Sequence, residues 1–275
     1  MARVNWVDRV PTKPGRVRLM PVEGDSNLYD MTREDAPQVE GTPLNAANLN
    51  AMQEGTGLTE NVTIYVANSG SDNTGNGTST APYATITKAL STIPKSLNGY
   101  TARVYIANGA YPEKLIINGF TGGTLMFTGN SNANISVTSI SIQHTEMLIF
   151  RNLHFSVTGG SDVLYGVHTT ASCMVVDTGS FSVSNASVSG IYAILGATVY
   201  FTTLTLSAVG NAVTATNGAQ IIVGTITGVS TDNGLRATAG GRIFYGNNTL
   251  STPTMHVTAS GGRILAGSQM SIPNY

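Results

Sequence analysis

Four side chains in the second half of the chain are of the types that acid–base chemistry uses: Glu146, His154, His168 and Asp177. Glycoside hydrolysis needs two carboxylates about 5 to 9.5 Å apart, whereas elimination needs a base beside a cation. A chain that repeats with a step of roughly 22 residues places positions one step apart side by side on neighbouring strands. His154 and Asp177 are about one such step apart in the sequence, and so are Glu146 and His168.

The alternative interpretation of these four residues is structural, and we favour it. Histidine and acidic side chains on a strand surface more often face solvent or bond to a neighbour than take part in catalysis. Within "HTEMLIFRNLHF", strict alternation places His144 and Glu146 on one face and Arg151 on the other. No spacing of histidine, cysteine or acidic residues is typical of a metal site. We therefore predict no catalytic, metal-binding or cofactor-binding residues and keep the four only as candidates.

Several aromatic residues have side chains that stack well on sugar rings: Tyr165, Tyr192, Tyr200, Phe201 and Tyr245. The alternation in "ATVYFTTL" buries at least one of Tyr200 and Phe201 in the core. The sequence therefore leaves sugar stacking open but does not define a binding site.

The segment "GSDNTGNGTSTAPYATITKAL", from Gly70 to Leu90, has the glycine content of a ligand-binding loop. A phosphate site would need the glycines to lead directly into a helix, but "TSTAPYA" intervenes and Lys88 lies inside the predicted helix. A calcium loop would need several converging carboxylates, and Asp72 is the only acid in this segment. We therefore interpret the segment as a connection that ends where Thr85 starts a helix.

A repeat near the end of the chain indicates the elements that position all of these residues. The segments "GATVYF", "GAQIIV", "GGRIFY" and "GGRILA" begin at Gly196, Gly218, Gly240 and Gly261, so they follow one another at an almost constant step. Units of roughly 22 residues with two or three short strands are typical of a solenoid, in which each unit buries its apolar face against the next. Leucine-rich repeats are excluded because the segments lack a leucine and asparagine ladder.

The predicted fold class is therefore mostly β, with a parallel β-helix over 59–275 and regular coils over about 101–267. Roughly seven or eight coils would give a rod about 35 Å long, with glycines at its corners and Val, Ile, Leu and Phe inside. An amphipathic helix is predicted over about 85–93 from the apolar spacing of Ile86, Ala89, Leu90 and Ile93. This helix would cover the unpaired strand edges at the N-terminal end of the rod.

Residues 1–58 form a segment of a different kind. The first sixty residues hold fifteen of the chain's twenty-nine charges and five of its prolines, with little alternation. The string "EGTPLNAANLNAMQEG" predicts a short helix with Thr42 as N-cap and Pro43 in its first position. Because about three turns are too few to be stable alone, this helix needs a partner, either its own domain or other copies of the chain. We predict an irregular N-terminal module.

Composition limits the classes of partner. Charged residues make up 11% of the chain, the net charge is −1, and no run of like charges occurs, so neither nucleic acid nor an anionic membrane surface is an expected partner. No apolar stretch approaches about 18 residues and no signal peptide is evident, so we expect a soluble protein made in the cytoplasm, without membrane insertion. The single cysteine, Cys173, is predicted to be a small buried core residue within "CMVV".

Two blocks of sequence resemble known families. The block "YVANSGSDNTGNGTSTAPYATITKALSTIPKSLNGYTARVYIANGAYPEKLIINGFTGG" is about a fifth of the chain. It resembles the opening of right-handed β-helix domains of the pectate-lyase-like superfamily, particularly those on bacteriophage tail fibres and tailspikes. The segment from "NWVDRV" through "YDMTREDAPQVEGTPLNAANLNAMQ" resembles the N-terminal part of tail or appendage proteins of phages and prophages of Gram-positive bacteria, and "EGTPLNAANLN" is the more specific of the two signals.

The β-helix resemblance extends to pectin methylesterases, but only for the fold. Glu113 in "NGAYPEKLII" matches an element that they share. Their "QDT" and downstream "GR" context is not reproduced in this sequence, so their activity does not carry over. We predict that Glu113 is structural.

The resemblance implies a virion protein of a phage or phage-derived particle, and the scarcity of charged residues favours a non-enzymatic, structural fibre over hydrolysis. Such a fibre is a homotrimer anchored to tail, baseplate or capsid proteins through residues 1–58, and it displays a right-handed β-helix for attachment to a host cell-surface glycan. It would be assembled in the bacterial host cytoplasm and released extracellularly as part of the virion. Two alternatives stay open: a polysaccharide depolymerase of the tailspike kind, acting as a lyase or hydrolase, and a purely structural adaptor for other appendage proteins.

Overall fold

The computed structural model describes residues 10–11, 17–22, 25–33, 37–39, 57–129, 133–160, 162–177 and 179–267. The chain divides into two compact units, residues 1–56 and 57–275. The boundary expected after residue 58 lies two residues from this division. No helix in the described ranges is long and apolar enough to span a membrane.

The first unit contains two small antiparallel sheets among its described residues. β1 (Val10–Pro11) pairs with β4 (Pro37–Val39), and β2 (Val17–Val22) pairs with β3 (Asp25–Arg33). The side chains that are described here are all exposed, at Arg18, Leu19, Met20 and Met31. The helix predicted to begin after Thr42 lies outside the described residues.

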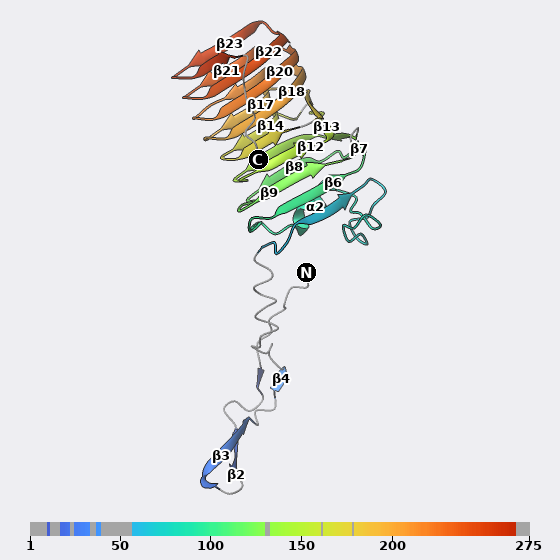
Figure 1. The fold of residues 1–275 in the computed structure, drawn as a ribbon, viewed down its shortest axis with the longest axis vertical. Helices are drawn as coiled ribbons and strands as arrows, with labels where there is room; N and C mark the ends of the chain where they lie inside the picture. The colour runs from blue at the N-terminus through green and yellow to red at the C-terminus, as the bar shows by residue number, and fades with distance from the viewer. Residues whose placement is uncertain are drawn as a thin grey trace. The chain divides into compact units, whose positions relative to one another are not determined.

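The second unit is a right-handed parallel β-helix of about seven turns, which confirms the predicted fold class (Figure 1). One sheet, which we call sheet 1, contains β5 (Val62–Val66), β6 (Thr101–Ile106), β7 (Gly109–Ala110), β9 (Thr124–Thr128), β10 (Asn134–Val137), β12 (Leu148–Arg151), β13 (Leu153–Val157), β15 (Cys173–Val176), β16 (Gly179–Ser184), β18 (Thr198–Val209), β20 (Gln220–Ser230), β22 (Arg242–Ser251) and β24 (Arg263–Ala266). The other, sheet 2, contains β8 (Lys114–Asn118), β11 (Ser139–Gln143), β14 (Tyr165–Thr170), β17 (Ser189–Ile194), β19 (Asn211–Ala215), β21 (Asn233–Thr238) and β23 (Thr254–Ala259).

Successive coils stack in register but differ in length. Leu148 pairs with Leu125 on one side and with Met174 on the other, and the second of these two coils is longer than the first. In the later coils the paired residues are Val199, Ile221, Ile243 and Ile264, which follow one another at an almost constant step. The repeat found in the sequence is therefore confirmed for the last coils, whereas the earlier coils are less regular because their connections vary in length.

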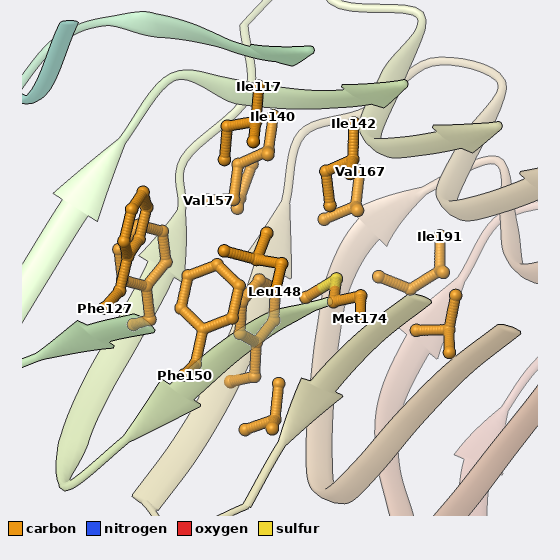
Figure 2. Packing of buried hydrophobic residues seen from close by; sticks show 14 of the residues in the cluster. Ile117, Phe127, Ile140, Ile142, Leu148, Phe150, Val157, Val167, Met174 and Ile191 are labelled. Carbon is orange, nitrogen blue, oxygen red and sulfur yellow. The ribbon is translucent and has the colours of Figure 1, made fainter. Parts of the chain in front are cut away.

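The inside of the rod is apolar because alternate residues of every strand point inward. Phe127 and Phe150 pack edge to face with their ring centroids 5.2 Å apart (Figure 2). The Phe155 ring centroid lies 4.9 Å from that of Phe150. On sheet 2, aliphatic side chains complete the same core, at Ile117, Ile140, Ile142, Val167 and Ile191 (Figure 2). Each side chain of this size contributes about 1.5 to 3 kcal/mol when it is buried. The predicted interior is confirmed.

The glycines that begin each repeat occupy a corner of the rod where the backbone is left-handed. Gly196 and Gly218 have φ values of 74° and 77°, and they follow Leu195 and Asn217 at 54° and 49°. A Cβ atom at either glycine would meet nothing within 4 Å. The left-handed backbone, rather than a lack of space, therefore favours glycine at this corner, as the repeat predicts.

Helix α2 (Ile86–Thr92) covers the N-terminal end of the rod. Thr85 is its N-cap and accepts a hydrogen bond from the Lys88 N–H. The helix buries an apolar face against the first coil and contacts β5, β6 and β8 through the side that includes Ile86, Ala89 and Leu90. The predicted capping helix over 85–93 is confirmed to within one residue at each end.

Two carboxylates from distant parts of the chain accept hydrogen bonds from the start of α2 and from the two residues before it. Asp72 accepts hydrogen bonds from the Ala84 N–H (2.8 Å) and from the N–H and hydroxyl of Thr85 (3.1 and 2.7 Å). Glu113 accepts from the Ile86 N–H (2.9 Å), the Thr87 N–H (2.8 Å) and the Thr87 hydroxyl. Partial burial alone would raise the pKa of Asp72, but the hydrogen bonds from Thr85 and Ala84 lower it below its usual value. Both acids therefore serve the cap, and the structural role predicted for Glu113 is confirmed.

Cys173 is not in the core, so that prediction is wrong. Because strand residues alternate, Met174 and Val176 point into the rod, and Cys173 and Val175 point out of it. Cys173 is half-buried against a separate apolar cluster on the outside of sheet 1. All residues of the run "CMVV" are apolar, so both faces of this strand are apolar. From sequence alone, such a strand cannot be told apart from one that lies inside a single core.

Candidate functional site

A groove with a volume of about 210 Å³ lies on the outer face of sheet 2, over β8, β11 and β14. Its lining includes a lysine, an aspartate, two serines and two aromatic rings, from Lys114, Ser139, Ser141, Asp162, Tyr165 and His168. One wall is the connection from β13 to β14, which begins after Val157 and ends before Tyr165. In a later coil, Gly210 alone separates β18 from β19. The groove therefore exists because this connection is longer than its later equivalents.

Strand alternation and register place a column of side chains on the floor of the groove. Ser141 pairs with Ile116 on one side and with His168 on the other, and His168 pairs with Tyr192. These residues point outward because the residues that flank them in each strand, such as Val167 beside His168, are buried in the core. The same register continues to Thr214, whose side chain is buried, and then to Arg236.

Three aromatic rings gather at one end of the groove. The rings of Tyr165 and Tyr192 are stacked, with centroids 4.5 Å apart and planes inclined by 27°. The His168 ring is 5.3 Å from Tyr165 and 5.5 Å from Tyr192. All three residues are half-buried, so part of each ring faces solvent. The cluster presents apolar ring surface beside hydroxyl and imidazole groups, a combination that suits amphipathic ligands.

Burial favours the uncharged forms of His168 and Tyr192 in this cluster. It lowers the pKa of His168 below the usual value of a histidine, so the imidazole is neutral at neutral pH. Burial also raises the pKa of the Tyr192 hydroxyl, and the nearby Tyr165 raises it further against the opposing effect of Arg236. The cluster therefore offers neutral donors and acceptors of hydrogen bonds.

An ion pair lies at the rim of the groove. The Lys114 Nζ is 2.6 Å from the Asp162 Oδ2 and donates a hydrogen bond to it, which joins β8 to the connection before β14. That hydrogen bond is the main reason why the pKa of Asp162 lies below its usual value. Both side chains are more than half exposed, so the pair adds little to stability. It places one cation and one carboxylate where a ligand in the groove would meet them.

Of the four candidate residues predicted from sequence, His168 alone lines this groove. The carboxylate of Glu146 accepts a hydrogen bond from the Gly122 N–H in a connection between strands. The His154 Nδ1 lies 2.6 Å from the Ser180 hydroxyl on the outside of sheet 1. Asp177 forms an ion pair with Arg151, with 2.6 Å between the guanidinium and Oδ2.

The stacking expected within the two pairs is wrong. His154 is aligned with Ser180 rather than with Asp177. His168 is aligned with Ser141 and Tyr192, and Glu146 precedes β12 and is not in a strand. Both pairs depended on the step of the later repeat, and the coils that contain these residues are longer than that step.

The alternation proposed for "HTEMLIFRNLHF" is also wrong at its start. His144 has a left-handed φ of 46° and lies at a corner, and β12 begins only at Leu148. Strict alternation therefore does not extend back to Glu146. It holds within β12, where Arg151 points outward. For Tyr200 and Phe201 the prediction is confirmed, because Phe201 is buried and Tyr200 is half-buried on the outside.

Lys114, Ser141 and Asp162 were missed as site residues, and Tyr165 and Tyr192 were noted only as separate aromatics. A signal for the aromatic cluster is present in the sequence: the segments "YGVHTT", "SGIYAI" and "NGLRAT" align strand for strand and place His168 beside Tyr192. The ion pair has no such signal, because Lys114 and Asp162 are far apart in the sequence and one of them lies in an irregular connection.

The groove combines an ion pair, an imidazole and aromatic rings. Its carboxylate is bound to Lys114, its imidazole is neutral, and ring faces and hydroxyl groups make up much of the remaining lining. Among the described residues, no group of three or more histidine, cysteine or acidic side chains is arranged to hold a metal ion. Comparison with protein-family models, curated proteins and solved structures finds no match for this chain.

Proposed function

We propose that this chain is a structural fibre protein of a phage or phage-derived particle, and that it attaches to a host-surface glycan through the groove on sheet 2. The stacked rings of Tyr165 and Tyr192 carry this proposal. Sugar rings have apolar C–H faces and polar edges, so they fit a site where an aromatic face lies beside hydroxyl, imidazole and charged groups. Those groups are the Ser141 hydroxyl, the His168 imidazole and the Lys114–Asp162 pair.

The proposed ligand is a polysaccharide with uncharged sugar units at the ring cluster. The rings themselves are neutral, and the cation and carboxylate at the rim compensate each other. A strongly anionic glycan would have to displace Asp162 from Lys114 before gaining a counter-charge there. A neutral sugar can instead accept hydrogen bonds from Lys114 and donate them to Asp162 without breaking the pair.

Binding should depend on the two stacked tyrosines. We expect the full-length protein to bind at least one member of a panel of purified wall and capsular polysaccharides from Gram-positive bacteria. Replacing either tyrosine (Tyr165→Ala or Tyr192→Ala) should weaken that binding about tenfold, because a lost aromatic contact of this kind is worth about 0.5 to 1.5 kcal/mol beyond the area that it buries. Calorimetric titration measures the change.

Tyr100→Ala is the matched control, because Tyr100 is an exposed tyrosine that does not line the groove. It should bind as the wild type does. Equal binding by Tyr165→Ala, Tyr192→Ala and the wild type would contradict the assignment of the groove, even if the protein proved to be a fibre.

The first unit is proposed to anchor the fibre and to assemble it as a homotrimer. The observation that supports this is the β2–β3 hairpin, in which Leu19 pairs with Met31 across the strands and both are more than half exposed. Met20, the neighbour of Leu19 in β2, is 51% exposed. Because an isolated two-stranded hairpin is marginally stable, apolar side chains exposed in this way call for contacts with other chains.

Removing residues 1–56 should therefore leave a folded rod that is monomeric. The measurement is molar mass by light scattering, with circular dichroism as the check on folding. The full chain is expected at three times the monomer mass and the 57–275 fragment at the monomer mass. A full chain that stays monomeric, or a fragment that still trimerises, would refute the role of the first unit in assembly.

A further inference from the structure

Two arginines lie side by side on the outside of sheet 1. Arg242 begins β22 and Arg263 begins β24, and the two residues pair in register on adjacent coils. Both are exposed. Their side chains point outward because the next residue of each strand, Ile243 or Ile264, packs against the core. Since neighbouring strands are about 4.8 Å apart, the two guanidinium groups can bind the same ligand.

Neither of these arginines has a counter-charge among the described residues. The ion pairs of the described ranges join Lys114 to Asp162 and Arg151 to Asp177. Asp232 lies at the corner before β21, whereas the arginine that begins β22 follows the corner after β21, and residues 233–267 include no acid. Like charges directly opposite one another on adjacent strands destabilise a sheet. An anion bound between the two guanidinium groups would therefore remove a repulsion.

The two preceding coils add further hydrogen-bond donors to the same column. Gln220 pairs in register with Arg242, and Thr198 pairs with Gln220. Both residues are half-buried. A glutamine amide and a threonine hydroxyl can each donate a hydrogen bond to an anion. Four successive coils therefore present a hydroxyl, an amide and two guanidinium groups in one row.

Charge and geometry both favour a phosphate group as the ligand of this row. A carboxylate has a single charge, and one guanidinium group can bind both of its oxygens. A phosphate ester carries a charge of about −1.5 to −2 at neutral pH and has three acceptor oxygens. It can therefore compensate both cations and accept hydrogen bonds from both guanidinium groups at once. Because the net charge of the whole chain is −1, such binding would depend on these local cations.

We propose that Arg242 and Arg263 form a binding site for a phosphate group on the outside of sheet 1, with Gln220 as an additional donor. The groove described above lies on sheet 2, so this site does not depend on the glycan proposed for the groove. The phosphate group can be free inorganic phosphate or a phosphate ester on a polymer, and the experiment separates these two sources.

The test is a calorimetric titration of the full-length protein with inorganic phosphate at constant ionic strength. Arg242→Gln and Arg263→Gln should each weaken phosphate binding about tenfold, because each removes a cation and its charge-assisted hydrogen bonds. The matched control is Arg103→Gln, which removes the same charge from another exposed arginine on the outside of sheet 1. Arg103 pairs with Thr63 and Met126 rather than with a second cation. This control should bind phosphate as the wild type does.

Chromatography on phosphocellulose, a polysaccharide that carries phosphate esters, identifies the source of the phosphate group. If the ligand is a polymer-borne phosphate, the wild type is retained and the two pair variants, Arg242→Gln and Arg263→Gln, elute at lower salt. If phosphate binds in the titration and the wild type is not retained, the ligand is free phosphate. Either result supports the site, provided that the control variant behaves as the wild type does.

Three results would overturn the proposal. The first is that the wild type does not bind inorganic phosphate. The second is that the control variant loses as much affinity as the pair variants, which would mean that only the net charge matters. The third is stronger retention on carboxymethyl cellulose than on phosphocellulose, which would assign the pair to a carboxylate. Circular dichroism of each variant checks that the rod is folded. None of these results bears on the tyrosine variants that test the groove.

Discussion

Thr169 is a polar residue inside an otherwise apolar column of the core. It lies between Ile142 and Ala193 on adjacent coils and is fully buried. Its hydroxyl has no hydrogen-bond partner among the described residues. Burying a hydroxyl without a partner costs about 1 to 3 kcal/mol. An apolar residue of the same shape at this position should therefore make the protein more stable.

Replacing this residue by valine (Thr169→Val) should raise the free energy of unfolding by about 1 kcal/mol, because the shape is kept and the unsatisfied hydroxyl is removed. Urea denaturation measures the change. The control is Thr214→Val, since the Thr214 hydroxyl is also buried but lies 3.1 Å from the Ser189 hydroxyl. That variant should lose about 1 kcal/mol, the usual net contribution of a hydrogen bond. Equal destabilisation of the two variants would show that the Thr169 hydroxyl has a partner after all.

The candidate site illustrates what sequence can and cannot indicate about single residues. His168 was identified as a candidate from its residue type, and its partner Tyr192 follows from aligning two strands of consecutive coils. Asp162 could not be placed from sequence, because it lies in a connection whose path no periodicity describes. The proposed pairing of His154 with Asp177 failed for a related reason, since the coil that contains them has extra residues between its strands.

At the scale of elements, α2 depends on a carboxylate supplied from another part of the chain. Glu113 accepts hydrogen bonds from the N–H groups of Ile86 and Thr87, which have no partner within a helix because they belong to its first turn. The helix has no acidic residue of its own in that turn. Glu113 and Asp72 therefore replace the local acidic residues that usually stabilise a helix N-terminus.

Glu113→Gln should destabilise the rod by about 1 to 2 kcal/mol. The amide oxygen can still accept one hydrogen bond, but the amide NH₂ would face the other backbone N–H group, and the negative charge is lost. The midpoint of urea unfolding of the 57–275 fragment is the measurement. Glu60→Gln serves as control, because Glu60 is exposed and precedes the first strand of the rod. A midpoint unchanged from the wild type in Glu113→Gln would contradict the capping role.

The elements that could be predicted from sequence are those that obey a period. The glycine corners at Gly196, Gly218, Gly240 and Gly261, the stacked strands of the last coils and the capping helix all follow from spacing, and the structure confirms them. The lengths of the earlier coils do not follow from spacing, because a solenoid fixes the register of its strands and leaves its connections free to vary in length. The groove lies at one of those variable connections, so it could not be found by extending the repeat.

At the scale of the molecule, the two outer faces of the rod differ in their chemistry. Sheet 1 carries a small apolar cluster of Met126, Ile149 and Val175 on its outside, and sheet 2 carries the groove with its half-buried rings. Residues 1–56 form a second compact unit of the chain. This division matches the proposed arrangement of an anchor that assembles the protein and a rod that contacts the host.

The central claim is that the protein binds a host polysaccharide without cleaving it. The most direct test is to incubate the full-length protein with the wall and capsular polysaccharide panel, recover the bound polysaccharide, and compare its size distribution with that of untreated material. We predict that at least one polysaccharide is retained and that its length, reducing ends and unsaturated sugar content are unchanged. Retention followed by shortening, with new reducing ends or unsaturated uronates, would identify a depolymerase and contradict the claim, and so would failure to retain any polysaccharide of the panel.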